Sequence, residues 1–261
     1  MSLPALEHLR ADYTEVWTSG PVVPLVRFAD RSLSIEASGL DLLELPDHDP
    51  NPHVLQSLRT FHSIVSWYGS TRPEFRARVA ELALPFHFFP ALPWGGGEHA
   101  MDFYWRQAQT LNSSPVRGRA PTLDCPRTEE GFAVIHPFSG SRRKNWPLDR
   151  FQELAQRLEG YCPVFWCASP EDRLEGAVQI ENLYELACWL AKARVFIGND
   201  SGISHLAASV RTPVVALFGP TDPTVWAPRG GPVAVLRAGP AMTDISTEAV
   251  LEAVCKLVFG H

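Results

Sequence analysis

The sequence has 261 residues, of which 45% are apolar and 20% charged, and this composition is typical of a globular protein that can bury a substantial core. The net charge of −6 argues against a general affinity for nucleic acid. No apolar run approaches the roughly 18 residues that a membrane-spanning helix needs, and we expect no transmembrane segment. The five cysteines include no CxxC pair, so we expect a reduced, cytoplasmic protein without a zinc cluster.

The first half of the chain predicts a loose alternation of helices and strands. We expect helices at residues 3–10, 22–29, 73–83 and 99–111, and strands at 14–17, 62–69 and 86–89. The following segment, NSSPVRGRAPTLDCPRTEE (112–130), is rich in Pro, Ser and Arg. This change in composition predicts a boundary between an N-terminal domain, 1–115, and a C-terminal domain, 116–261.

The second half alternates more clearly. We expect strands at residues 132–137, 163–167, 178–180, 195–198 and 213–218, and helices at 147–160, 182–193, 202–210 and 246–258. Pro147 suits the first position of its helix, and Gly160 suits the end. Strands that alternate with helices predict right-handed βαβ units and a parallel sheet. Open parallel sheets bind ligands beyond the carboxyl ends of their strands, and two such domains form a cleft.

The segment GNDSG (198–202) joins an apolar strand to a helix and is the first candidate for a ligand site. Asp200 or Ser201 can cap the first amides of the helix, and Gly202 permits close approach to the backbone, so the helix start suits a phosphate. A simple N-cap explains Asp200 equally well. Ser201 and His205 share a helix face, but a catalytic Ser–His dyad is not favoured because no acidic partner or nucleophile elbow accompanies them.

The segment HPFSGSRRKNWP (136–147) is the second candidate. Ser139, Gly140 and Ser141 form a small loop, and three cations, Arg142, Arg143 and Lys144, follow it. A solvated basic loop is the plainer interpretation, but such a loop at the end of a strand also resembles a phosphate cradle. The chain contains neither a P-loop nor a G-x-G-x-x-G motif, which argues against a nicotinamide or flavin cofactor.

Three other polar positions have plainer interpretations. His99 and Asp102 are spaced as a helical pair, and we expect a surface pair rather than an acid–base couple. His136 at a strand end is expected to be a structural hydrogen-bonding residue. Glu171 in SPED (169–172) is explained by a role in a helix start.

Two long stretches resemble glycosyltransferase family 9, the lipopolysaccharide heptosyltransferases: HPFSGSRRKNWPLDRFQELAQRL and GNDSGISHLAASVRTPVVALFGPTDP. LPALEHLR and HAMDFYWRQAQTL resemble the family's N-terminal domain more weakly. The resemblance implies a GT-B fold, with two Rossmann-like domains whose parallel sheets face a cleft. It also implies inverting, metal-independent transfer of heptose from an ADP-linked donor to lipopolysaccharide, a glycolipid acceptor at the cytoplasmic face of the inner membrane. No cofactor is implied, only the nucleotide-sugar donor.

The resemblance also assigns roles to particular residues. It implies that Lys144 contacts the donor diphosphate, beside the hydroxyl groups of Ser139 and Ser141. Glu171 matches a position near the donor ribose, and Glu181, Asn182 and Leu183 match the segment that faces the base. The diphosphate and sugar end is matched by Asp200, Ser201, Gly202 and His205. Asp200 is negative, so we expect it to cap the turn or accept a hydrogen bond from a hydroxyl group rather than touch phosphate.

The start of the chain departs from the family pattern. Members normally have a strand and a Gly-Asp turn ahead of the stretch that matches LPAL, and here only Met1 and Ser2 precede it. We therefore expect the N-terminal domain to be incomplete. A start that was assigned too late, or one that was shortened, is favoured over a degenerate member of the family as the reason. The family's candidate base, the Asp of that turn, has no counterpart, and His99 and Asp102 are weak substitutes.

Two other functions are compatible with the sequence. A nucleotide-sugar-binding member of the same family with impaired catalysis is the alternative to an active transferase. A different GT-B enzyme, such as a nucleotide-sugar epimerase, is disfavoured by the pair KNWP and NDSGISHLA.

Overall fold

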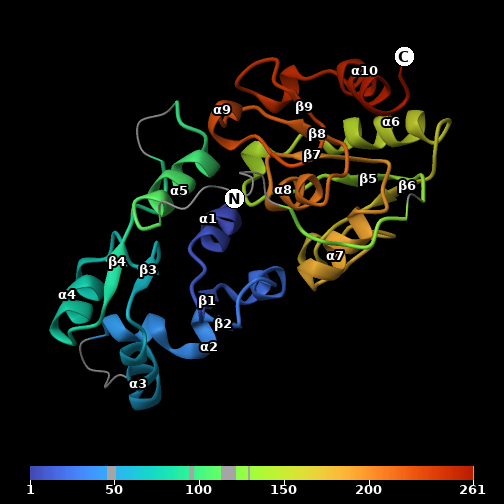
Figure 1. Cartoon of the computed structure of the whole chain (residues 1–261). Helices are drawn as coiled ribbons and strands as arrows, with labels where there is room; N and C mark the ends of the chain where they lie inside the picture. Colours follow the sequence, from blue (N-terminus) through green and yellow to red (C-terminus); the bar gives the residue numbers. More distant parts are fainter. Residues whose placement is uncertain (46–50, 94–96, 113–121, 129, 261) are drawn as a thin grey trace. The chain divides into compact units, whose positions relative to one another are not determined.

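The computed structural model describes residues 1–45, 51–93, 97–112, 122–128 and 130–260 (Figure 1). The chain forms two compact units. The N-terminal unit comprises Ser2–Gly96 and Phe103–Pro115, and the C-terminal unit comprises Met1, Gly97–Asp102 and Val116–His261. The short segment Gly97–Asp102 therefore packs with the C-terminal unit. The boundary predicted at 115/116 lies outside the described residues and stays a prediction.

The C-terminal unit is built on a parallel sheet of five strands in the order β6-β5-β7-β8-β9. The strands are β5 Ala133–His136, β6 Val164–Trp166, β7 Val195–Asn199, β8 Val214–Leu217 and β9 Val233–Leu236. The α-helices are α6 Leu148–Leu158, α7 Leu183–Leu190, α8 Gly202–Ser209, α9 Pro223–Trp226 and α10 Thr247–Val258, and the 3₁₀ turns are η3 Arg142–Lys144, η4 Pro170–Asp172 and η5 Met242–Asp244. The register sets Ala133 of β5 opposite Val164 of β6 and Val195 of β7. The predicted α/β class with a parallel sheet is confirmed.

Helices cover both faces of this sheet, α6 and α10 on one side and α7 and α8 on the other (Figure 1). The central strands β5, β7 and β8 are consequently buried along their whole length, which explains their continuous apolar sequence. Ile135, Ile197 and Leu217 point to the α6 and α10 side, where they join one core cluster. The opposite residues of each strand face α7 and α8.

Helix α6 buries the face on which its apolar residues recur at helical spacing. Phe151, Leu154, Ala155 and Leu158 are buried, and Leu148 at its start is 39% exposed. Pro147 has extended backbone angles and is the N-cap, so its predicted place as the first helical residue is wrong by one position. The helix ends at Leu158, before Gly160.

The N-terminal unit contains two separate parallel sheets of two strands each, β1-β2 and β3-β4. Its strands are β1 Glu15–Thr18, β2 Arg31–Ser34, β3 Ile64–Ser66 and β4 Phe86–Phe88. Its α-helices are α1 Leu3–His8, α2 Ile35–Ser38, α3 Pro52–Thr60 and α4 Pro73–Glu81, together with α5 Ala100–Gln109 from Phe103 onward, and its 3₁₀ segments are η1 Gly20–Leu25 and η2 Leu40–Glu44. Phe75, at the centre of one core cluster, is fully buried against Phe86 and Phe88.

Two predicted elements are wrong. The helix expected at 22–29 is a 3₁₀ segment that ends at Leu25, because Pro24 inside it has no N–H group to donate. The strand expected at 178–180 is reduced to a single bridge between Val178 and Cys167. Strands β2 and β9 and helix α3 were not predicted from the sequence.

Candidate functional site

The end of β7 and the start of α8 form the turn that the sequence singles out. Ser201 is the N-cap of α8, and its Oγ accepts a hydrogen bond from the Ser204 N–H at 3.4 Å. Ser201, rather than Asp200, is therefore the cap. The N–H groups of Gly202 and Ile203 precede the first intrahelical bond, and Gly202 is exposed. A Cβ atom at Gly202 would meet nothing within 4 Å, so the space above this helix end is open.

Lys144 is brought to this turn from the neighbouring strand. β5 and β7 pair directly, so the loop after β5 lies beside the turn after β7. Lys144, the last residue of η3, donates from Nζ to Asp200 Oδ2 at 3.2 Å. The two side chains are 24% and 10% exposed, so the ion pair is partly shielded from water. Asp200 thus accepts a hydrogen bond, as expected, but from an ammonium group rather than a hydroxyl group.

Asn199 joins the two loops, and sequence reasoning assigned it no role. Its side chain is fully buried at the end of β7. Oδ1 accepts from the Trp146 N–H at 2.9 Å, and Nδ2 donates to the Pro137 carbonyl oxygen at 2.8 Å. Both partners belong to the segment that carries Lys144. The polar atoms of a buried asparagine side chain almost always have hydrogen-bond partners. The position of Asn199 at the end of an apolar strand is therefore the feature of the sequence that could have indicated its role.

The loop before Lys144 is closed by its own hydrogen bonds. The Ser139 hydroxyl group donates to Asn145 Oδ1 at 2.7 Å and contacts the Ser141 carbonyl oxygen at 2.9 Å. Ser141 is exposed and is the N-cap of η3. Ser139 therefore shapes the loop, whereas the Ser141 side chain is accessible to a ligand.

The residues matched to the donor ribose and base follow β6, the strand on the other side of β5. Ser169 and Asp172 form a capping box around η4, so the cap role expected for Glu171 belongs to Asp172. Glu171 is exposed. Asn182 caps α7 by accepting from the N–H groups of Tyr184 and Glu185, and Glu181 beside it is also exposed. The residues matched to the diphosphate and ribose thus follow β5, β7 and β6, three adjacent strands, whereas Glu181, Asn182 and Leu183 follow the bridge that Val178 makes with Cys167 and lead into α7.

Two histidines of the C-terminal unit, His205 and His136, have lowered pKa values. Burial, followed by nearby positive charge that includes Lys144, lowers the pKa of His205 to about 3. Burial also lowers the pKa of His136, whose Nδ1 bonds the Cys167 carbonyl oxygen at 2.8 Å. His136 is the structural residue that the sequence predicted. His205, one helical turn from Ser201, is a neutral imidazole at pH 7.

His99 and Asp102 do not form the surface pair that was predicted. His99 is buried, and its Nδ1 accepts the Met101 N–H at 3.2 Å, so Nε2 is the atom that donates to the Ala227 carbonyl oxygen at 2.9 Å. Burial lowers the pKa of His99. Asp102 instead pairs with Arg229 at 2.8 Å. Both residues therefore hold the 227–229 loop, which follows α9.

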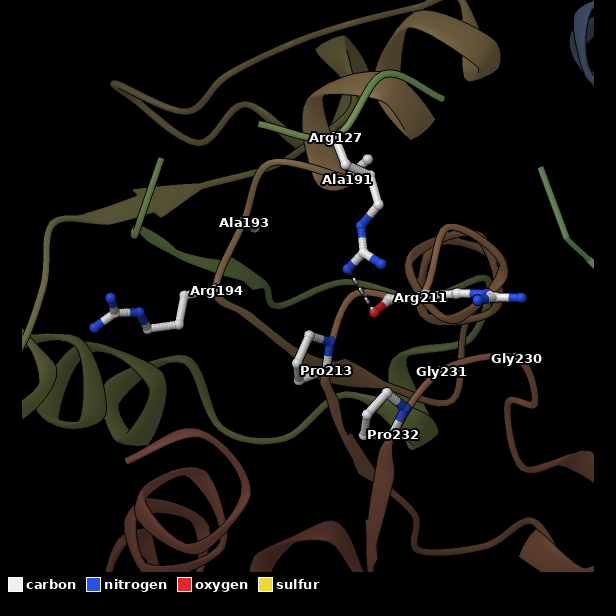
Figure 2. A pocket seen from close by; sticks show the side chains of 9 residues that line it. All are labelled: Arg127, Ala191, Ala193, Arg194, Arg211, Pro213, Gly230, Gly231 and Pro232. Atoms are coloured by element: carbon white, nitrogen blue, oxygen red, sulfur yellow. Dashed lines mark hydrogen bonds between the residues drawn. The ribbon is translucent and has the colours of Figure 1, made fainter. Parts of the chain in front are cut away.

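A separate pocket lies at the opposite edge of the sheet. Its cavity of about 730 Å³ is lined by residues that precede β7, β8 and β9, among them Arg194, Arg211 and Gly231. Figure 2 shows Arg127 reaching the Arg211 carbonyl oxygen, at 3.4 Å, while the Arg194 side chain points away from them. None of the residues matched to the donor lines this pocket.

A parallel α/β unit that gathers a lysine and a free helix start at its strand ends is typical of nucleotide-phosphate-binding domains. Residues 98–253 match the family Glycosyltransferase family 9 (heptosyltransferase). That match covers more than half of the chain and includes every candidate site residue. The chain therefore belongs to glycosyltransferase family 9.

Individual relatives agree with this assignment. The chain is 29% identical over 144 residues to lipopolysaccharide heptosyltransferase 3 of Escherichia coli K12, a match that covers 49% of this chain and 42% of that protein. It is 26% identical to lipopolysaccharide heptosyltransferase 1 of the same strain over 201 residues, 76% of this chain and 56% of that protein. The matched part thus spans about half the length of these curated relatives.

Solved structures show the same fold. A glycosyl transferase family 9 structure from Veillonella parvula superposes with a TM-score of 0.73 at 17% identity, covering 100% of this chain and 93% of that one. The E. coli ADP-heptose lps heptosyltransferase II gives a TM-score of 0.72 at 19% identity, covering 99% and 95%.

Proposed function

We propose that this protein transfers a sugar, heptose from ADP-heptose, to a lipopolysaccharide-type acceptor. Membership of family 9 and the functions of its heptosyltransferase relatives support this activity. The observation that carries the donor site is the placement of the Lys144 ammonium group beside the open start of α8. Both features are positive, and a diphosphate leaving group is the part of such a donor that needs positive potential.

The reaction proposed is a direct displacement with inversion. The acceptor hydroxyl oxygen bonds to the anomeric carbon of the donor sugar as the bond from that carbon to the diphosphate oxygen breaks, and the acceptor proton passes to a base. Negative charge grows on the diphosphate, where Lys144 and the N–H groups of Gly202 and Ile203 stabilise it. Because these groups supply positive charge, we propose that the transfer does not need a metal ion.

The rest of the donor extends along the same sheet edge toward β6. There the exposed Glu171 carboxylate can accept hydrogen bonds from ribose hydroxyl groups, and the segment 181–183 faces the base. We propose that His205, one helical turn from the Ser201 cap of α8, lines the sugar end of this site as a neutral imidazole, since burial lowers its pKa.

The proposed acceptor is a glycolipid at the cytoplasmic face of the inner membrane, with the protein bound peripherally. The described helices include none with both the length and the apolar character to cross a bilayer.

One observation favours the alternative, a donor-binding protein with impaired transfer. His99 donates to a backbone carbonyl group and Asp102 is paired with Arg229, so neither substitute base is free to accept the acceptor proton. A positioned base contributes about 10²–10⁴-fold to such reactions.

The test is transfer of labelled sugar from ADP-heptose to a heptose-deficient lipopolysaccharide acceptor, with ADP binding measured in parallel. Transfer together with binding supports the transferase. Binding without transfer supports the alternative. Absence of both would overturn the donor site, and a preference for UDP-linked or GDP-linked sugars in a thermal-shift panel would overturn the choice of ADP.

A further inference from the structure

The C-terminal unit brings two cysteine side chains into contact. Cys125 lies in the segment 122–128, which precedes β5, and Cys188 lies in α7. The Cys188 thiol group donates to Cys125 Sγ at 3.1 Å, although 63 positions separate the two residues. The S–S bond of a disulfide is about 2.05 Å long, so the two sulfur atoms need to approach by only about 1 Å to form one.

The segment that carries Cys125 is held on both sides of that residue. The Leu123 N–H donates to the carbonyl oxygen of Ser209, the last residue of α8, at 3.1 Å. The Glu130 N–H donates to the Lys192 carbonyl oxygen at 3.0 Å, and the Glu130 carboxylate pairs with Lys192 Nζ at 2.9 Å. These contacts keep Cys125 in place before any covalent bond forms. Two groups held in this way react at a much higher effective concentration than two flexible ones.

One face of α7 lies along this segment. Tyr184 and Cys188 are four positions apart, so their side chains lie on the same face of the helix. The Tyr184 hydroxyl group donates to the Asp124 carbonyl oxygen at 2.9 Å, and one turn later the Cys188 thiol group meets Cys125, the next residue of the segment. The hydrogen bond of Tyr184 therefore fixes the register in which the two sulfur atoms meet.

The two thiol groups differ in their access to solvent. Cys125 is buried, whereas Cys188 is half-buried. A small reagent in solution therefore reaches Cys188 first, while Cys125 lies in contact with it from the inner side. An accessible cysteine next to a second cysteine that can attack it is the usual arrangement of a redox-sensitive pair.

We propose that Cys125 and Cys188 are a redox modification site, which a low-molecular-weight disulfide such as glutathione disulfide converts to an intramolecular disulfide. Cys188 Sγ loses its proton and attacks one sulfur atom of the reagent, whose S–S bond breaks and releases one thiol. Cys125 Sγ then loses its proton and attacks Cys188 Sγ, and the bond from Cys188 to the second thiol breaks. The two cysteines are oxidised, the reagent is reduced to two thiols, and these thiols take up the two protons.

The new bond would tie the segment 122–128 covalently to α7. It spans 63 positions of the chain, and a cross-link over a loop of that length restricts the unfolded state strongly. We expect the melting temperature to rise by at least about 5 °C on oxidation. We also expect the Leu123 amide to exchange at least about tenfold more slowly, because the bond prevents the segment from opening locally. This inference does not depend on the donor site.

The experiment equilibrates the full chain with mixtures of glutathione and glutathione disulfide. Intact mass should show a loss of about 2 Da for two hydrogen atoms, and peptide mapping without reductant should place Cys125 and Cys188 in one cross-linked pair. At a fixed glutathione concentration, the folded chain should be half oxidised at a glutathione disulfide concentration at least about tenfold lower than the chain unfolded in urea, because the fold holds the sulfur atoms together.

Three serine variants make the result specific, and their melting temperatures in excess reductant show that each is folded. Cys125→Ser removes the second attacking thiol, so Cys188 should keep one bound glutathione. Cys188→Ser should form no disulfide with Cys125. Cys255→Ser is the matched control, because Cys255 is also half-buried on a helix, and it should leave the disulfide between Cys125 and Cys188 unchanged.

Four outcomes overturn the proposal. The first is separate binding of glutathione to Cys125 and Cys188, or to neither, without a cross-link between them. The second is an intramolecular disulfide that persists in Cys188→Ser, which shows that another pair reacts. The third is half oxidation at the same glutathione disulfide concentration in the folded and the unfolded chain. The fourth is a cross-link that changes neither the melting temperature nor the exchange of the Leu123 amide.

Discussion

Lys144 Nζ and Asp200 Oδ2 lie 3.2 Å apart although their residues are separated by 56 positions in the sequence. The pairing of β5 with β7 brings them together, and Asn199 fixes the two loops with hydrogen bonds on both sides. The ion pair holds the lysine at the strand ends before any ligand binds. A cation held in place in this way loses less conformational freedom when it binds a phosphate.

Lys144→Ala should weaken ADP binding and donor-dependent turnover by on the order of 10²-fold, because one charge-stabilising donor to the diphosphate is lost. Titration calorimetry and the transfer assay measure the two effects. Arg142→Ala, two residues earlier in η3, is the matched control and should change both by less than about threefold. Equal effects of the two substitutions would show that the loop acts through its general charge.

Gly202→Ala should separate ligand binding from stability. A Cβ atom there meets no other atom of the fold, so the free energy of unfolding should change by no more than about 0.5 kcal/mol. A phosphate on the Gly202 N–H group needs that open space, so we expect ADP affinity to fall about tenfold. Gly160→Ala, just beyond the end of α6, is the control, because a Cβ atom there makes only an ordinary contact with the Arg157 carbonyl oxygen at 3.6 Å. Unchanged ADP affinity in Gly202→Ala would remove the diphosphate from the start of α8.

Asn199→Ala should lower the free energy of unfolding by about 2–4 kcal/mol, because it leaves a buried N–H group and a buried carbonyl group without partners. Asn182→Ala removes an exposed helix cap and should cost about 1 kcal/mol. Urea denaturation of both variants gives the comparison. If the two costs were equal, Asn199 would not be the residue that holds the loops together.

The pH dependence of stability follows from the lowered pKa of His205. The unfolded imidazole takes up a proton near pH 6.5, whereas the folded one does so only near pH 3. Stability should therefore fall as the pH drops below about 6.5, by up to about 1.4 kcal/mol per pH unit for this group. His205→Gln should make the slope between pH 6.5 and 5 shallower, as measured by denaturation at each pH. An unchanged slope would show that His205 takes up its proton in the folded state.

The sequence predicted the C-terminal unit well because its signals are local. Strands β5, β7 and β8 are continuous apolar runs, and the apolar residues of α6 recur at helical spacing. Each of these patterns can be recognised within its own segment, without knowledge of the segments that pack against it. The loop and the turn that carry Lys144 and Asp200 were also found, because strand ends in a parallel sheet share one edge.

What the sequence missed depends on contacts between distant segments. The roles of Asn199, His99 and Asp102 are set by partners at Trp146, Ala227 and Arg229, which no local pattern indicates. The two separate sheets of the N-terminal unit could not be foreseen either, because short strands such as β3 have only three residues of pattern.

We propose above all that the donor diphosphate binds at the carboxyl edge of the five-stranded sheet without a metal ion. Calorimetric titration of ADP in the presence of EDTA tests it most directly, with wild type, Lys144→Ala and Arg211→Ala, which alters the pocket at the opposite edge. We predict that wild type and Arg211→Ala bind ADP equally well in EDTA and that Lys144→Ala binds on the order of 10²-fold more weakly. Loss of binding in EDTA, or in Arg211→Ala but not in Lys144→Ala, would contradict the claim.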